Sequence, residues 1–134
     1  MAEVFELELI KIQPSQLYIS KKKLEIILTK FNPTDINTLG VIPIKKLGQD
    51  IIYTDGHTRA FVAYLKGFEK IQAEWETENL DWEMYQECVN WCKDENIYSI
   101  VDLRTRIIEH EDYKILWYDR CEKMQKEILE RKKK

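Results

Sequence analysis

The chain reads Ile51-Ile52-Tyr53-Thr54-Asp55-Gly56-His57-Thr58-Arg59-Ala60 where an apolar strand passes directly into a helix. A helix start leaves backbone N–H groups without intrahelical partners and carries the positive end of the helix dipole. Gly56 lacks a Cβ, so it can adopt a positive φ and let a phosphate approach the backbone closely. Arg59 can reach back over the same opening with a planar guanidinium, and Thr58 can add a hydroxyl. These features predict a phosphate-binding turn at Gly56, His57, Thr58 and Arg59.

Two residues of this turn are candidates for catalysis. Asp55 can hold Mg²⁺ beside a bound phosphate or accept a proton from a nucleophile, and His57 can donate or accept a proton near neutral pH. The spacing alone leaves a purely structural interpretation open. In that interpretation Asp55 is the N-cap of the helix and Gly56 is a tight-turn residue. His57 then faces solvent, and Arg59 pairs with a surface glutamate such as Glu69.

Short strands alternate with helical patterns along the first 78 residues. Residues 5–12 alternate apolar and acidic side chains, which is typical of a half-buried strand. Ser20 is the expected N-cap of a helix that ends at Asn32-Pro33, and Gly67 is placed to end a second helix. Further strands are predicted over residues 41–47, 50–54 and 71–75, and that second helix over residues 57–66. We therefore predict an α+β fold with a small mixed sheet and packed helices.

The pattern is helical throughout after Glu78. Ser99 and Asp102 offer a capping box, and a final helix is expected over residues 110–131. Its apolar side is predicted to comprise Tyr113, Leu116, Trp117, Met124 and Ile128. We divide the chain into an α+β domain that carries the phosphate-binding turn, residues 1–78, and an all-helical C-terminal extension, residues 79–134. We expect the extension to pack on the sheet or on a second copy of the chain, as in a homodimer, and to cover the site.

Composition limits the classes of protein to which the chain can belong. The 134 residues are 44% hydrophobic, with only four glycines and three prolines, which excludes collagen-like and disordered chains. No apolar run approaches the roughly 18 residues that a membrane span needs. The first ten residues carry three glutamates where a signal peptide would carry positive charge. We therefore expect a cytoplasmic protein with no membrane partner.

The charge distribution argues against DNA as a partner. The net charge is −3, and neither the first 78 residues nor the remainder is basic, unlike a dedicated nucleic-acid binder. Arg104 and Arg106 are flanked by the acidic residues Asp102 and Glu109, so a recognition helix is not favoured there. Affinity for phosphate must then be local to one turn, which fits a mononucleotide better than a DNA backbone.

The three cysteines suggest neither a disulfide framework nor a zinc site. Their number is odd, and reduced thiols are the default. Cys88 and Cys92, together with His110 and Cys121, lack the two close pairs that structural zinc sites show. Cys92 falls on the apolar stripe of its helix, as a small core residue would. Asp55, as a ligand of Mg²⁺, is the one metal ligand that we predict.

The sequence resembles the ParB N-terminal and sulfiredoxin-like superfamily over roughly residues 5–76. The resemblance rests on residues 39–44, 51–60 and 64–68, which read Leu-Gly-Val-Ile-Pro-Ile, then the strand and turn quoted above, then Tyr-Leu-Lys-Gly-Phe. Members of that superfamily bind nucleotide phosphates with a Gly-x-x-Arg turn at a helix start, which falls here on Gly56 and Arg59. The resemblance implies a ParB/sulfiredoxin-like fold and a nucleotide such as ATP, ADP or CTP, with Mg²⁺ beside it.

The branches of that superfamily differ around the turn. Sulfiredoxins place a catalytic cysteine directly after the glycine, where this chain has His57. ParB partition proteins show a Gly-Glu-Arg-Arg-like turn, of which Gly56 and Arg59 match. The turn is most similar to Asp-Gly-His-x-Arg of the free serine kinases, which Asp55 completes. Those kinases also use a glutamate in a Pro-x-Glu segment, and Gln16 stands at that position, so nucleotide binding carries over better than phosphotransfer.

Three functions follow as expectations. The first is a stand-alone ParB-like protein that binds a nucleotide. The second is a phosphotransferase or nucleotide hydrolase, above all a small-molecule kinase that moves a phosphoryl group from ATP or ADP to a hydroxyl metabolite. Asp55 or His57 would then handle the proton of that substrate. The third is a DNA-associated ParB-like accessory protein, whose binding would weaken as salt rises.

Overall fold

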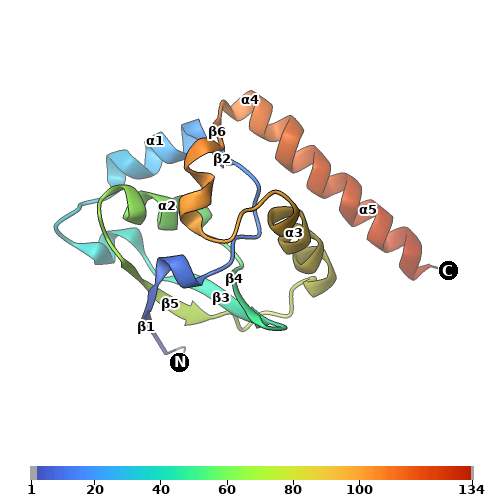
Figure 1. The fold of residues 1–134 in the computed structure, drawn as a ribbon, viewed down its shortest axis with the longest axis horizontal. Coiled ribbons are helices and arrows are strands. Elements are labelled where there is room, and N and C mark those ends of the chain that lie inside the picture. The colour runs from blue at the N-terminus through green and yellow to red at the C-terminus, as the bar shows by residue number, and fades with distance from the viewer. Residues whose placement is uncertain (1–2, 134) are drawn as a thin grey trace.

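The chain folds into two small sheets and a set of helices, which a computed structural model describes over residues 3–133 (Figure 1). The strands are β1 (Phe5–Glu8), β2 (Ile19–Ser20), β3 (Ile42–Leu47), β4 (Asp50–Tyr53), β5 (Lys70–Trp75) and β6 (Ile107–Ile108). The α-helices are α1 (Lys21–Lys30), α2 (His57–Leu65), α3 (Trp82–Asp94), α4 (His110–Tyr113) and α5 (Arg120–Lys132). Three short 3₁₀ helices are η1 (Leu9–Lys11), η2 (Ile36–Leu39) and η3 (Ile100–Thr105). A π-helical segment, η4 (Lys114–Asp119), joins α4 to α5.

The larger sheet is mixed, which confirms the predicted α+β class. Its strand order is β1-β5-β3-β4, with β5 antiparallel to β1 and parallel to β3, and β3 antiparallel to β4. Ala73 pairs with both Phe5 and Ile42, and Ile44 pairs with Tyr53. Ile42, Ile44 and Tyr53 are fully buried, so the centre of this sheet faces the core. The buried end of β4 therefore holds the start of α2 in a fixed position relative to the sheet.

Two predicted elements differ in detail. The strand expected over residues 5–12 ends at Glu8, because the chain turns there into η1 and buries Leu9 against the core. The capping box is confirmed, since Ser99 Oγ accepts from the Val101 N–H and Asp102 Oδ2 accepts from the Ser99 N–H. It starts a 3₁₀ helix, however, and residues 107 and 108, which lie in the part of the chain predicted to be helical throughout, form β6. This strand pairs in parallel with β2, a contact that local periodicity does not encode.

The expected helix boundaries agree more closely. Ser20 caps α1, because its Oγ accepts from the Lys23 N–H at 3.3 Å. The final helix is continuous from α4 through η4 to α5 and buries Tyr113, Trp117, Met124 and Ile128. Leu116, which we placed on the same apolar side, is 44% exposed, so that prediction is wrong. Leu116 lies in the π-helical segment η4, whose wider turn changes the α-helical spacing, and it is turned away from the face that buries Trp117.

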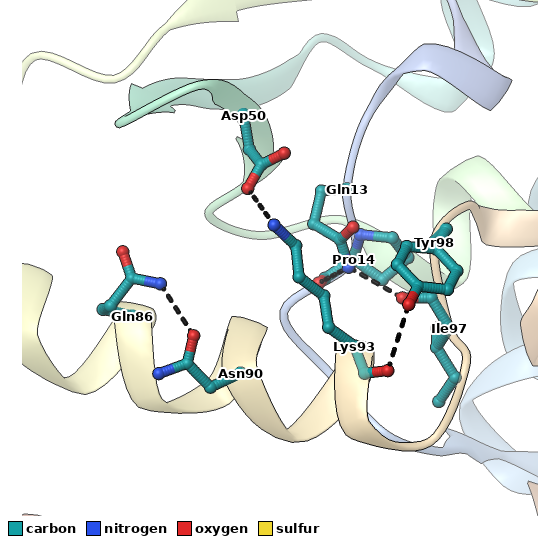
Figure 2. A network of polar contacts seen from close by, with 8 residues as sticks. All are labelled: Gln13, Pro14, Asp50, Gln86, Asn90, Lys93, Ile97 and Tyr98. Atoms are coloured by element: carbon teal, nitrogen blue, oxygen red, sulfur yellow. Dashed lines mark hydrogen bonds and ion pairs between the residues drawn. The ribbon is translucent and has the colours of Figure 1, made fainter.

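The helical part is tied to the sheet by the polar network in Figure 2. Gln13, which is 5% exposed, donates through Nε2 to the carbonyl of Ile97 at 2.8 Å. Lys93 Nζ lies 2.6 Å from Asp50 Oδ2, which joins α3 to β4. The hydroxyl of Tyr98 donates to the carbonyl of Lys93 at 3.3 Å. One hydrophobic core includes residues from both predicted domains, and the boundary at residue 78 stays a prediction.

Candidate functional site

The predicted turn lies where β4 runs into α2. Gly56 is the N-cap of α2 and adopts the left-handed conformation, with φ of 79° and ψ of 19°. Asp55 is exposed, and its Oδ1 accepts from the Gly56 N–H at 2.7 Å. The structural interpretation that made Asp55 the N-cap is therefore wrong. The carboxylate stands one residue before the N-cap, beside the opening that we assigned to a phosphate.

Arg59 reaches back over the turn as its sequence position predicts. Its Nη1 donates to the carbonyls of Val41 at 3.2 Å and Leu39 at 3.4 Å, which anchors one edge of the guanidinium. A Cβ placed on Gly56 would lie 2.9 Å from Nη2, so the guanidinium covers the glycine. No carboxylate of residues 3–133 forms an ion pair with Arg59, contrary to the surface-pair interpretation. The positive charge is thus held in place and left available to an anion.

His57 is buried, which excludes the interpretation that it faces solvent. It is 5% exposed, packs on the Tyr53 ring at 5.1 Å between centroids, and accepts through Nε2 from the Ser15 N–H at 2.9 Å. Burial lowers its pKa to about 4, and the nearby Asp55 carboxylate opposes this only in part. The imidazole is therefore neutral near pH 7, and the bond at Nε2 assigns its proton to Nδ1.

A pocket of about 270 Å³ opens in front of the turn. The structure brings all five predicted site residues together on its wall: Asp55, Gly56, His57, Thr58 and Arg59. Thr58 is 8% exposed, and its hydroxyl makes no hydrogen bond with any described residue. Every fully enclosed polar side-chain atom of residues 3–133 has a partner, so this hydroxyl is not fully enclosed, and Thr58 lines the pocket. A ligand in the pocket can then supply the partner that a polar group in such a position normally has.

The opposite wall holds residues that sequence reasoning missed. Lys23, Ile26 and Ile27 come from α1, and Tyr113 comes from the C-terminal helix. Lys23 Nζ bonds to the hydroxyl of Tyr118 and lies 5.2 Å from the Tyr113 ring centre. The sequence held one local signal for Lys23. A lysine in the first turn of a helix lies unfavourably close to the positive end of the helix dipole, which suggests that it has a function other than stabilising the helix. Tyr113 had no such signal, since only the tertiary fold carries it to the pocket.

The residues that line the pocket carry a net positive charge, although the net charge of the protein is negative. Lys23 and Arg59 supply two cations, Asp55 supplies one carboxylate, and His57 is neutral. The N-terminus of α2 adds its free N–H groups and its dipole on the same side. Among the described lining residues Asp55 is the one carboxylate, so Mg²⁺ held there would take its remaining ligands from phosphate oxygens and water. The arrangement suits a phosphate group.

A second pocket of about 180 Å³ adjoins the first across Gln16, Asp55 and His57. Its far wall is formed by side chains of α3 and the C-terminal helix: Met84, Tyr85, Cys88, Trp117, Cys121 and Gln125. The hydroxyl of Tyr85 donates to the carbonyl of Thr54 at 2.8 Å, and burial beside Asp55 raises the pKa of Tyr85 to about 12. Tyr85 therefore stays protonated and fixes α3 to the residue before the turn.

Comparisons with known proteins find similarity to solved structures but to no family. No family model matches the chain, and no curated protein matches it. The crystal structure of protein Atu1540 from Agrobacterium tumefaciens is similar, with 13% identity and a TM-score of 0.46 over 73% of this chain. The match covers 51% of the Atu1540 chain, so this chain spans about half of that length. Over residues 3–133, no helix combines the length and the apolar character needed to cross a membrane.

Proposed function

We propose that this chain binds a mononucleotide through its phosphates at the turn from Asp55 to Arg59. The observation that carries the proposal is the guanidinium of Arg59, anchored over Gly56 by two backbone carbonyls and paired with no carboxylate of the described chain. A cation held in this way loses little side-chain entropy when it binds, and its planar edge matches two phosphate oxygens. The left-handed Gly56 has no Cβ, and this leaves room for the guanidinium to lie against the turn.

Each wall of the pocket has a part in this binding mode. The first N–H groups of α2 and the hydroxyl of Thr58 donate to phosphate oxygens from one side. Lys23 approaches from α1 on the other side, and Asp55 holds Mg²⁺ against the same phosphates. Ile26 and Ile27 offer apolar surface for the remainder of the ligand. ATP, ADP and CTP all carry the phosphate groups that this arrangement recognises.

A small-molecule kinase, as the free serine kinase resemblance suggests, is the second candidate. Asp55 supports it, because this carboxylate is exposed at the pocket and can accept the proton of a hydroxyl substrate. His57 is less suited to proton transfer, since its Nε2 is occupied by Ser15 and its pKa is about 4. We assign His57 a positioning role in either function. Gln16 lines the pocket, but its amide cannot act as a general base as the glutamate of those kinases does. Nucleotide binding without turnover is therefore our first choice. We also place the protein in the cytoplasm.

Calorimetric titration with ATP, ADP and CTP, each with and without Mg²⁺, tests the binding. Arg59→Ala should lower the affinity for the preferred nucleotide by about tenfold or more, because a hydrogen bond to a charged group contributes about 1.5–3 kcal/mol. Arg104→Ala is the matched control, since Arg104 also donates to a backbone carbonyl but lies outside the pocket. Absence of binding by all three nucleotides, or equal affinity in Arg59→Ala and the parent, would refute the proposal.

Turnover separates the two candidates. The protein is incubated with ATP or ADP and with free serine or other hydroxyl metabolites, and nucleotide products are measured. Product that disappears in Asp55→Asn supports the kinase, whereas bound but unconverted nucleotide supports a binding protein. A gel shift that weakens with salt would instead indicate the DNA-associated function.

A further inference from the structure

Two cysteines from different helices meet beside the candidate site. Cys88 lies on α3 and Cys121 on α5, the two helices pack against each other, and both side chains line the second pocket. Cys88 is 3% exposed, whereas Cys121 is partly exposed. Cys121 is therefore the more accessible of the two cysteines to a reagent that enters the pocket.

The surroundings make the two thiols chemically unequal. The neighbouring Cys88 thiol lowers the pKa of Cys121, and the positive charge of Arg120 lowers it further against the effect of burial. The neighbouring Cys121 thiol, together with burial, raises the pKa of Cys88. Cys121 therefore ionises first, and the thiolate is the form of cysteine that attacks an oxidant.

We propose that Cys88 and Cys121 form a redox pair that closes to a disulfide and fastens the C-terminal helix to α3. Cys121 supplies the accessible attacking sulfur, and Cys88 supplies the enclosed sulfur that resolves the oxidised intermediate. The inference does not depend on the nucleotide, because it rests on the second pocket and on the contact between two helices.

The oxidant is a hydroperoxide small enough to enter the pocket. The Cys121 thiolate attacks the O–O bond, which breaks, so that Cys121 becomes a sulfenic acid and hydroxide or alkoxide leaves. The Cys88 sulfur then attacks the Cys121 sulfur, the S–S bond forms, and the S–O bond breaks. The departing hydroxyl takes the Cys88 proton and leaves as water. Two electrons pass in total from the two sulfurs to the peroxide.

Cys92 provides a natural contrast on the same helix as Cys88. It is fully buried, its Sγ donates to the carbonyl of Gln16 at 3.6 Å, and it does not line the second pocket. Burial raises its pKa to about 12. We assign Cys92 a packing role and expect it to take no part in the oxidation.

The test oxidises the full, reduced chain with hydrogen peroxide and follows the intact mass. We expect the loss of two hydrogen atoms, a cross-linked peptide that joins Cys88 to Cys121, and reversal by dithiothreitol. Cys121→Ser should abolish this product, and Cys92→Ser should retain it. The oxidised parent should also melt at a higher temperature than the reduced parent, because a cross-link restricts the unfolded chain.

A second variant keeps the test decisive. In Cys88→Ala the sulfenic acid at Cys121 has no resolving thiol, so peroxide should carry it on to sulfinic acid. Melting curves of the reduced variants establish whether each one folds. If Cys88→Ala does not fold, the comparison of Cys121→Ser with the parent chain tests the proposal by itself. A parent chain that yields sulfinic acid at Cys121 with Cys88 still free, or a link to Cys92, would overturn the proposal.

Discussion

His57 accepts a hydrogen bond at Nε2 from the backbone N–H of Ser15 across 2.9 Å. The bond joins the first residue of α2 to the segment before β2, and the Ser15 hydroxyl adds a bond to the carbonyl of Tyr53 at 2.8 Å. It requires a lone pair on Nε2, so it exists only while the imidazole is neutral. The buried position of His57 secures that state near neutral pH.

Folding stability should therefore fall on acidification. The folded pKa of His57, about 4, lies below its ordinary value of 6.5, so the unfolded chain binds the proton first. The contribution is complete above pH 6.5 and is lost progressively as the pH falls towards 4, to a total of about 3 kcal/mol. Urea denaturation at several pH values measures the slope.

The second histidine provides the control. His110→Gln should retain the acid dependence, because His110 is bonded to Ser20 at the start of α4, away from the turn. His57→Gln should flatten it. An equal slope in His57→Gln and the parent chain would show that other groups cause the acid dependence.

Gly56→Ala should lose both stability and ligand affinity. The left-handed backbone penalises any Cβ by about 1–2 kcal/mol, and here the Cβ would also displace Arg59. Gly67→Ala is the matched control, because Gly67 has φ of 85° but a Cβ there would meet no atom within 4 Å. Thermal melting should show a loss in both variants, whereas calorimetry should show weaker nucleotide binding in Gly56→Ala alone. Unchanged affinity in Gly56→Ala would place the phosphate elsewhere.

Thr58→Val should lower the affinity for the nucleotide without lowering the stability of the fold. The Thr58 hydroxyl has no hydrogen-bond partner in residues 3–133, so its removal breaks no internal hydrogen bond, and Thr58 lines the pocket. Loss of one hydrogen bond to the ligand corresponds to about 1 kcal/mol, or roughly fivefold in affinity. Thr58→Ser keeps the hydroxyl and should bind like the parent. A marked drop in the melting temperature of Thr58→Val would show instead that the hydroxyl is structural.

Gln13→Met should loosen the helical part from the sheet. Its Nε2 is the buried donor to the carbonyl of Ile97, and loss of that donor costs about 1–3 kcal/mol. Gln86→Met is the control, since Gln86 donates to Asn90 on the exposed face of α3 (Figure 2). Urea denaturation should separate the two variants, and equal stability would mean that the buried bond contributes nothing.

Local patterns predicted the elements that local physics determines. Ser20 marks the start of α1, Gly56 adopts the positive φ expected of it, and Gly67 follows the end of α2. The side chain of Arg59 also lies over the turn as its position one helical turn later requires. The alternation of short strands and helical patterns over the first 78 residues also predicted the mixed sheet.

Contacts between distant residues explain what the sequence could not predict. Nothing near His57 reveals that Ser15 covers it, and solvent exposure was an equally consistent expectation. Tyr113 reaches the pocket only because the C-terminal helix packs beside α1. Ile107 forms a strand because Ile19 lies next to it, although its own spacing fits a helix. Periodicity describes one segment at a time and contains no information about its neighbours in space.

The pairing of Ile19 with Ile107 also sets the order in which the chain can complete its fold. A ribosome delivers β2 early and β6 much later, so β2 has no paired edge until residue 108 has emerged, whereas Ser15 can bond to Tyr53 and His57 well before that. Closing so long a loop is entropically costly and slow compared with forming a hairpin. Tyr113 of the first pocket and Trp117 and Cys121 of the second lie beyond residue 108, so these parts of the two walls are added after the turn that they face.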